Sequence, residues 1–103
     1  MHAFDVLGDP VRRRILELLA PGELSSGAIT EVVQAEFGIS QPAVSQHLRV
    51  LKQAGLVADT AAGRRRLYAV HPAGLEALRT YLEGLWSQAL ASYQRVAERE
   101  EER

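Results

Sequence analysis

Cysteine is absent from the 103-residue sequence. This absence excludes disulfides, thiolate zinc sites, iron–sulfur clusters, cysteine nucleophiles and a direct thiol redox switch. Long apolar runs are also lacking, because no stretch approaches the roughly 18 residues that a membrane-spanning helix needs. The start, Met1-His2-Ala3-Phe4-Asp5, lacks the basic and apolar regions of a signal peptide. We therefore expect a cytoplasmic protein with no membrane partner.

A strong overall charge is missing as well, since the formal net charge is −1. The charges are nevertheless unevenly distributed. Residues 1–38 carry three arginines against six acidic residues, and residues 72–103 carry four arginines against six glutamates. Between them, residues 39–71 carry five basic residues against Asp59 alone, namely Arg49, Lys52, Arg64, Arg65 and Arg66. A basic centre between acidic ends predicts that only this part contacts nucleic-acid phosphates.

The length suits one domain with a single modest core. Asp9 and Pro10 are a typical N-cap and first residue of a helix, and Pro21-Gly22 ends it. Its apolar residues, Val11, Ile15, Leu18 and Leu19, recur at helical spacing. Phe4 and Leu7 are expected in a short helical turn before it.

A second helix is capped by Ser25 or Ser26 and ends at Gly38. Its predicted apolar stripe consists of Ile29, Val32, Val33 and Phe37. After Gly38-Ile39, Ser40 offers another N-cap, so a third helix over about 40–54 follows with Pro42 in its first turn and Gly55 at its end. Two helices joined by a tight glycine turn are typical of a helix-turn-helix, whose second helix can enter the major groove.

The third helix is predicted to have two different faces. Val44, Leu48 and Leu51 point inward, with Val50 and Ala54 at the edge. The predicted DNA-contacting residues of this segment are Ser40, Gln41, Pro42, Ala43, Ser45, Gln46, His47 and Arg49. Glutamine and arginine can bind adenine and guanine edges in a bidentate manner. An ordinary solvated helix face is the alternative, but the glycine turn before it and the basic hairpin after it favour DNA binding.

A hairpin is predicted after the third helix, with strands at 56–58 and 66–70 around a loop at 59–63. Its tip carries Gly63 and three adjacent arginines, Arg64, Arg65 and Arg66. Adjacent arginines are also typical of a simple solvated loop. Beside a helix that enters the groove, however, they favour contact of this wing, residues 58–68, with phosphates or the minor groove.

A long final helix is predicted from about Pro72 to residue 97, followed by a frayed charged tail at 98–103. Its apolar stripe is longer than one small core can cover, so its second half is expected to pack on another copy of the chain. The predicted dimer-interface residues are Phe4, Leu7, Leu78, Leu82, Leu85, Trp86, Ala89, Leu90 and Tyr93.

Four segments together resemble the ArsR/SmtB family of bacterial transcriptional repressors, over roughly residues 4–85. They are residues 7–16 (LGDPVRRRIL), 39–48 (ISQPAVSQHL), 54–57 (AGLV) and 63–68 (GRRRLY). The resemblance implies a mainly α winged helix-turn-helix with a small β-hairpin, and a homodimer built from the first and last helices. It also implies repression at an inverted-repeat operator, relieved in many members by a metal or another signal.

The sequence departs from the best-known members in its metal ligands. It lacks their cysteines, and after Pro72 it lacks the His and Asp that other members place on the last helix. The histidines, His2, His47 and His71, are scattered, whereas transition metals need several ligands at fixed geometry. We therefore expect no metal and no cofactor, and the inducer is unknown.

The predicted function is that of a dimeric repressor that binds double-stranded DNA. Two alternatives remain: a winged-helix protein-interaction module without operator binding, and a metal-responsive repressor with His and Glu ligands. An enzyme is not expected, because the sequence shows no paired-carboxylate motif, no glycine-rich phosphate loop and no nucleophile with an evident base. Ser45 and His47 are close in sequence, but residues two apart on a helix point in different directions.

Overall fold

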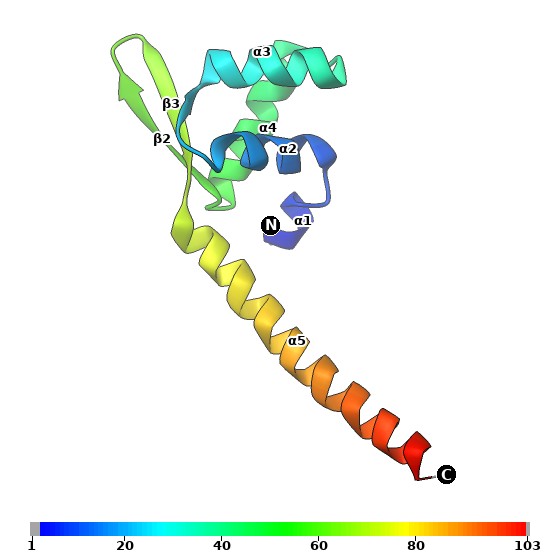
Figure 1. Cartoon of the computed structure of the whole chain (residues 1–103). Helices are drawn as coiled ribbons and strands as arrows, with labels where there is room; N and C mark the ends of the chain where they lie inside the picture. The colour runs from blue at the N-terminus through cyan, green and yellow to red at the C-terminus, as the bar shows by residue number, and fades with distance from the viewer. Residues whose placement is uncertain (1–2, 103) are drawn as a thin grey trace.

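A computed structural model describes residues 3–102 of the chain. Within that range the elements follow one another as α1 (Ala3–Val6), α2 (Pro10–Leu19), β1 (Leu24–Ser25), α3 (Ser26–Phe37), α4 (Gln41–Gln53), β2 (Val57–Ala62), β3 (Arg65–Val70) and α5 (Pro72–Glu101). The first seven elements form a head, residues 3–71, from which α5 extends as a long arm (Figure 1). The arm makes the molecule elongated, with extents of 68 × 28 × 25 Å.

The predicted caps set the helix starts. The Asp9 carboxylate accepts hydrogen bonds from the backbone N–H groups of Val11 and Arg12, and the hydroxyls of Ser25 and Ser40 cap α3 and α4 in the same way. Gly38 ends α3 with a φ of 67°, in the left-handed region that glycine enters without steric cost. The predicted helix-turn-helix is therefore confirmed in α3 and α4.

One core joins α2, α3, α4 and the start of β2. Val44, Leu48 and Leu51 of α4 are buried in it, as their spacing predicts. Phe37 is an exception to the predicted stripe of α3, because it is 37% exposed at the last residue of the helix. The other buried residues are Val6, Val11, Ile15, Leu19, Ile29, Val33, Leu56, Val57 and Leu78.

The sheet has the strand order β1-β3-β2, and both pairings are antiparallel. The predicted hairpin is present, but its strands are longer than expected. Residues 59–62, predicted as loop, belong to β2, so the turn is confined to Gly63-Arg64. Strand β1 was not predicted, since two residues give no periodic signal, and it is defined only by its pairing with Leu67 and Tyr68 of β3.

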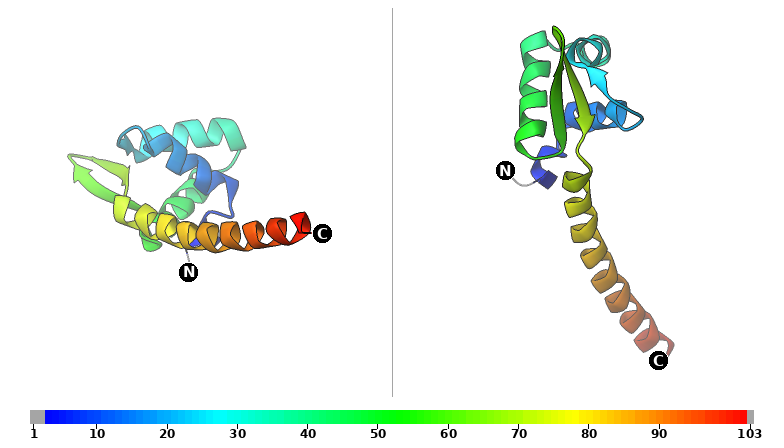
Figure 2. Two further views of the ribbon diagram at one scale, coloured as in Figure 1. Left: turned by 60° about the horizontal axis from the view of Figure 1, so that its bottom comes forward. Right: turned by 90° about the vertical axis from the view of Figure 1, so that its left-hand side faces the viewer.

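Helix α5 leaves the head at a tight junction. The His71 backbone N–H donates to the carbonyl of Leu56, and Gly74 lies so close to the Gly55 carbonyl that a Cβ there would overlap it. From this point the helix extends away from the head, as the right-hand view of Figure 2 shows. It continues to Glu101, four residues beyond the predicted end at 97. No helix in the described part of the chain is long and apolar enough to cross a membrane.

Candidate nucleic-acid interface

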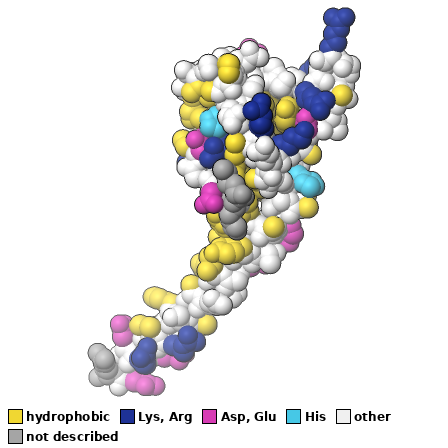
Figure 3. Space-filling model, turned by 180° about the vertical axis from the view of Figure 1, so that it is seen from behind, with side chains coloured by type: hydrophobic (Ala, Val, Ile, Leu, Met, Phe, Trp, Pro, Cys, Tyr) yellow, Lys and Arg dark blue, Asp and Glu magenta, His cyan; other side chains and the backbone are white. Residues whose placement is uncertain are grey.

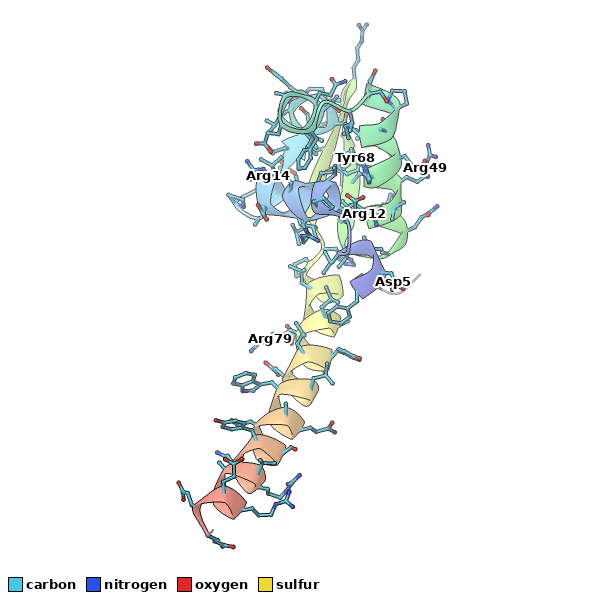
Figure 4. The ribbon with its side chains drawn as sticks, turned by 90° about the vertical axis from the view of Figure 1, so that its right-hand side faces the viewer. Asp5, Arg12, Arg14, Arg49, Tyr68 and Arg79 are labelled. Atoms are coloured by element: carbon cyan, nitrogen blue, oxygen red, sulfur yellow. The ribbon has the colours of Figure 1, made fainter. Side chains whose placement is uncertain are left out.

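The outer face of α4 carries the predicted groove-contacting residues. Most are exposed, including Gln41, Pro42, Ser45, Gln46 and Arg49, as is the cap residue Ser40. Figure 4 shows Arg49 pointing outward from the helix, where its Nη1 donates to Oε1 of Gln46 at 2.8 Å. This hydrogen bond links two of the side chains best suited to base edges, and Ala43 is half-buried beside them.

His47 lies differently from the other predicted contact residues. It is half-buried, and its Nδ1 lies 3.5 Å from Nη1 of Arg12. The Nε of Arg12 in turn donates to the carbonyl of Val6 at 2.6 Å. His47 therefore contacts Arg12 of α2, and through Arg12 it links α4 to the last residue of α1.

The three arginines of the wing are not equivalent. Arg64 lies in the two-residue turn, Arg65 begins β3, and both are exposed. Arg66 is part of the strand, and its Nε donates to Oδ2 of Asp59 at 2.7 Å. Lys and Arg side chains gather on the face of the molecule that carries α4 and the wing (Figure 3).

Asp59 is the acidic partner of two cations in this region. Its Oδ1 lies 2.8 Å from Nζ of Lys52, so the carboxylate joins α4 to the wing. The Asp59 side chain is only 6% exposed. Its hydrogen bond with Lys52, and then that with Arg66, lowers the pKa of this carboxyl below its ordinary value. It is therefore charged at neutral pH.

A hollow of about 350 Å³ separates α4 from the wing. Its lining combines three cations with three hydroxyl groups over the buried Leu48: Arg49, Lys52, Arg66, Ser26, Ser45 and Tyr68. Ser26, Asp59 and Tyr68 are not among the contact residues predicted from the sequence, and Lys52 enters that prediction only as part of the basic stretch 39–71. The signal available was Asp59 itself, the one acidic residue of the basic stretch 39–71.

The second predicted surface lies along α5. Trp86 and Tyr93 are 69% and 72% exposed, and Leu82, Leu85 and Leu90 are also exposed. Leu78, in contrast, is 7% exposed and packs into the chain's own core. At the N-terminal end of the arm, the rings of Phe4 and Tyr81 lie 5.0 Å apart, which places α1 against α5. Leu7 is half-buried against the same core.

The histidines and acidic residues are too dispersed for a metal site: within residues 3–102, no group of three or more His, Asp or Glu could hold an ion. His71 lies at the N-cap position of α5, with its Nδ1 3.2 Å from the Gly55 carbonyl oxygen. His2 lies outside the described residues.

Comparison with known proteins agrees with this geometry. Residues 7–60 match the family model described as a helix-turn-helix domain. The HTH-type transcriptional regulator Rv2034 of Mycobacterium tuberculosis is 46% identical over 99 residues, which cover 96% of this chain and 89% of that protein. The transcriptional repressor SdpR of Bacillus subtilis is 37% identical over 75 residues, covering 73% and 79% of the two chains.

A solved structure also resembles this chain. It is the solution structure of the homodimeric winged helix-turn-helix DNA-binding domain Mb0332 from Mycobacterium bovis, described as a possible ArsR-family transcriptional regulator. It matches with a TM-score of 0.61 and 27% identity, and it covers 82% of this chain and 74% of that one.

Proposed function

This chain belongs to the ArsR family of winged helix-turn-helix transcriptional regulators, and from that premise we propose how it binds its operator. The family is one of DNA-binding regulators and repressors rather than enzymes. In our proposal, α4 enters the major groove while the wing contacts the backbone or the minor groove. The single observation that carries this proposal is the common face of α4 and the wing, on which basic residues gather (Figure 3).

The groove-facing residues are assigned roles by their chemistry. Arg49, Gln46 and Gln41 are exposed on α4 and can form the paired hydrogen bonds that distinguish bases. Ser40, Pro42, Ala43 and Ser45 permit close approach because their side chains are short. Arg64 and Arg65 at the tip of the wing bind phosphates or the minor groove, which fixes the register of the protein on the duplex.

We further propose that the active species is a homodimer held by α1 and α5. The exposed apolar side chains of α5, Trp86 and Leu82 among them, would be covered by a second copy. A two-fold dimer presents two copies of α4 about 34 Å apart, one turn of DNA. Such a dimer would bind an inverted repeat, because the symmetry of the site mirrors that of the protein. The homodimeric Mycobacterium bovis domain supports the dimer part of this proposal.

Selection of random DNA duplexes on the purified protein, followed by a mobility-shift titration of the recovered sequence, tests this proposal. We expect an inverted repeat with half-site centres about 10 bp apart. Arg49→Ala should weaken binding to that repeat more than to scrambled DNA, because it removes a base contact. Replacing Arg64 and Arg65 by Ala should weaken binding to both DNAs equally, because phosphate contacts do not discriminate sequence.

The matched control is Arg95→Ala, which removes the same charge from the distant end of α5. Absence of any shift with any inverted repeat at low salt would contradict operator binding and favour a protein-interaction module. A shift that requires added Zn²⁺ would instead favour a metal-responsive regulator.

A further inference from the structure

The hollow between α4 and the wing contains more positive charge than its acidic partner can balance. Arg49, Lys52 and Arg66 line it, and Asp59 is the acidic residue that binds two of them. The set therefore has an excess of two positive charges. The Lys52 and Arg66 side chains are each 52% exposed, whereas Asp59 is 6% exposed behind them. An anion that approaches from solvent meets the cations first.

The strand register explains why one wing arginine faces this hollow. Arg66 and Tyr68 are two residues apart on β3, so they share one face of the sheet. In the pairing with β2, Tyr68 lies opposite Asp59, and Arg66 lies diagonal to it. That face lies against α4, since both side chains line the hollow together with α4 residues. Arg65, at the alternate position, points to the other face.

Asp59 leaves donors available on both cations. It accepts from Nε of Arg66, which leaves the terminal NH₂ groups of the guanidinium able to donate to a second anion. The Lys52 ammonium has three N–H donors, and the ion pair with Asp59 needs one. The hydroxyls of Ser26, Ser45 and Tyr68 add neutral donors around the same space. Several converging donors of this kind suit the oxygens of a phosphate.

We propose that this hollow binds one phosphodiester of the DNA backbone, with Lys52 and Arg66 as donors and Asp59 as the residue that positions both. The proposal rests on the proposed function, because it requires DNA to lie along α4. Asp59 joins the wing to α4, so it holds donors from two elements at one fixed separation. Preorganised donors lose less conformational entropy when the phosphate binds.

A backbone scan tests the site directly. Each phosphate of the selected operator is replaced in turn by a neutral methylphosphonate, and affinities are measured for the wild-type chain and for the Lys52→Met/Arg66→Met variant. We expect one position in each half-site to weaken wild-type binding markedly and to leave the variant unaffected. A variant that loses as much as the wild type at every position would overturn the proposal. So would saturable binding of inorganic phosphate by the protein alone with no position-specific loss, which would assign the hollow to a free anion.

The salt dependence gives a second readout. Loss of one phosphate contact should reduce the slope of log K against log [KCl] by about 1, and the affinities for operator and scrambled DNA should fall by the same factor. The control Arg95→Met, on the polar side of α5, should leave the slope unchanged. An unchanged slope in the Lys52→Met/Arg66→Met variant argues against the site. If the wild-type chain itself binds no DNA, it is the proposed function that fails.

The Asp59→Asn variant tests whether Asp59 acts by positioning Lys52 and Arg66 or only through its negative charge. If only net charge mattered, removal of this acid would tighten DNA binding. We expect weaker binding instead, by several-fold, because Lys52 and Arg66 lose their common anchor. The melting temperature of each variant is recorded beside its affinity, and Asp59→Glu, which keeps the charge, serves as a second variant if the amide variant unfolds. Glu should retain more affinity than Asn, and an Asn variant that is folded and binds DNA more tightly than the wild type would refute the positioning role.

Discussion

In the head, residues 3–71, the apolar side chains of α2, α3 and α4 meet in one core, whereas the arm, α5, leaves most of its apolar side chains in solvent. Leu78 is the one buried residue among 72–101, although Leu82, Leu85, Leu90 and Trp86 follow at helical spacing. The core therefore comes almost entirely from the head, and Leu78 is the one buried residue that the arm adds to it. The arm carries apolar surface that needs a further partner, since burial of such surface is what stabilises a long amphipathic helix.

A charge on the exposed apolar face of the arm should have the strongest effect of all the substitutions considered. Leu82→Glu would place a charge in the proposed interface, and an uncompensated buried charge costs about 3–5 kcal/mol. We expect sedimentation velocity to show monomers in which the head stays folded, together with a loss of operator affinity. Ala91→Glu, on the opposite side of α5, is the control and should leave the dimer intact. A dimer that survives Leu82→Glu would move the interface away from the arm.

The difference between head and arm also shows what the sequence could predict. The caps Asp9, Ser25 and Ser40 act within one or two turns of their helices, so their patterns predict the helix starts directly. The inward residues of α4 follow from the same local periodicity. The sequence pattern places Asp59 in a loop and gives no sign of its two ion pairs, because they join segments that only the tertiary fold brings together. Leu78 belongs to the same apolar stripe as Leu82, and periodicity cannot tell which of the two the head covers.

The second prediction concerns the head itself. Ile15→Ala removes a fully buried side chain from the core and should lower the free energy of unfolding by about 2–5 kcal/mol. Because the lost contacts lie within one chain, this loss, measured by urea denaturation, should not depend on protein concentration. Leu90→Ala in the arm is the comparison, and its effect should shrink at concentrations below the dimer dissociation constant. Equal concentration dependence of the two variants would contradict a separately folded head.

The third prediction concerns the junction between the two regions. A Cβ on Gly74 would overlap the Gly55 carbonyl, so Gly74→Ala must push α5 away from the end of α4. We expect a loss of about 1–3 kcal/mol in the free energy of unfolding, which is typical of overpacking. The matched control is Gly84→Ala in the same helix, where no atom lies within 4 Å of the added methyl.

The two glycine variants should change stability in opposite directions. Replacing a glycine in a helix interior by alanine stabilises by about 0.5–1 kcal/mol when there is space for the methyl group. Thermal unfolding of both variants at one protein concentration measures the contrast. If Gly74→Ala were as stable as Gly84→Ala, the close packing of α5 on α4 would be wrong, and the arm would be attached to the head less rigidly than its geometry indicates.

The ion pair between Arg14 and Glu36 in the head should make a small, acid-sensitive contribution to the free energy of unfolding. The hydrogen bond from Arg14 lowers the pKa of the Glu36 carboxyl below its ordinary value of 4.5, and it joins α2 to α3 through two N–O distances of 2.8 and 2.9 Å. Because the pKa of Glu36 is lower in the folded state, the ion pair stabilises the fold above pH 4.5. This stabilisation is lost as the pH falls through the pKa that Glu36 has in the folded protein. Glu36→Gln should therefore flatten the decline of the free energy of unfolding in acid, measured by urea denaturation from neutral pH downward. Arg14→Met should flatten it to the same degree, because it removes the cause of the shift, and a Glu36→Gln variant with the full wild-type decline would show that this pair does not contribute.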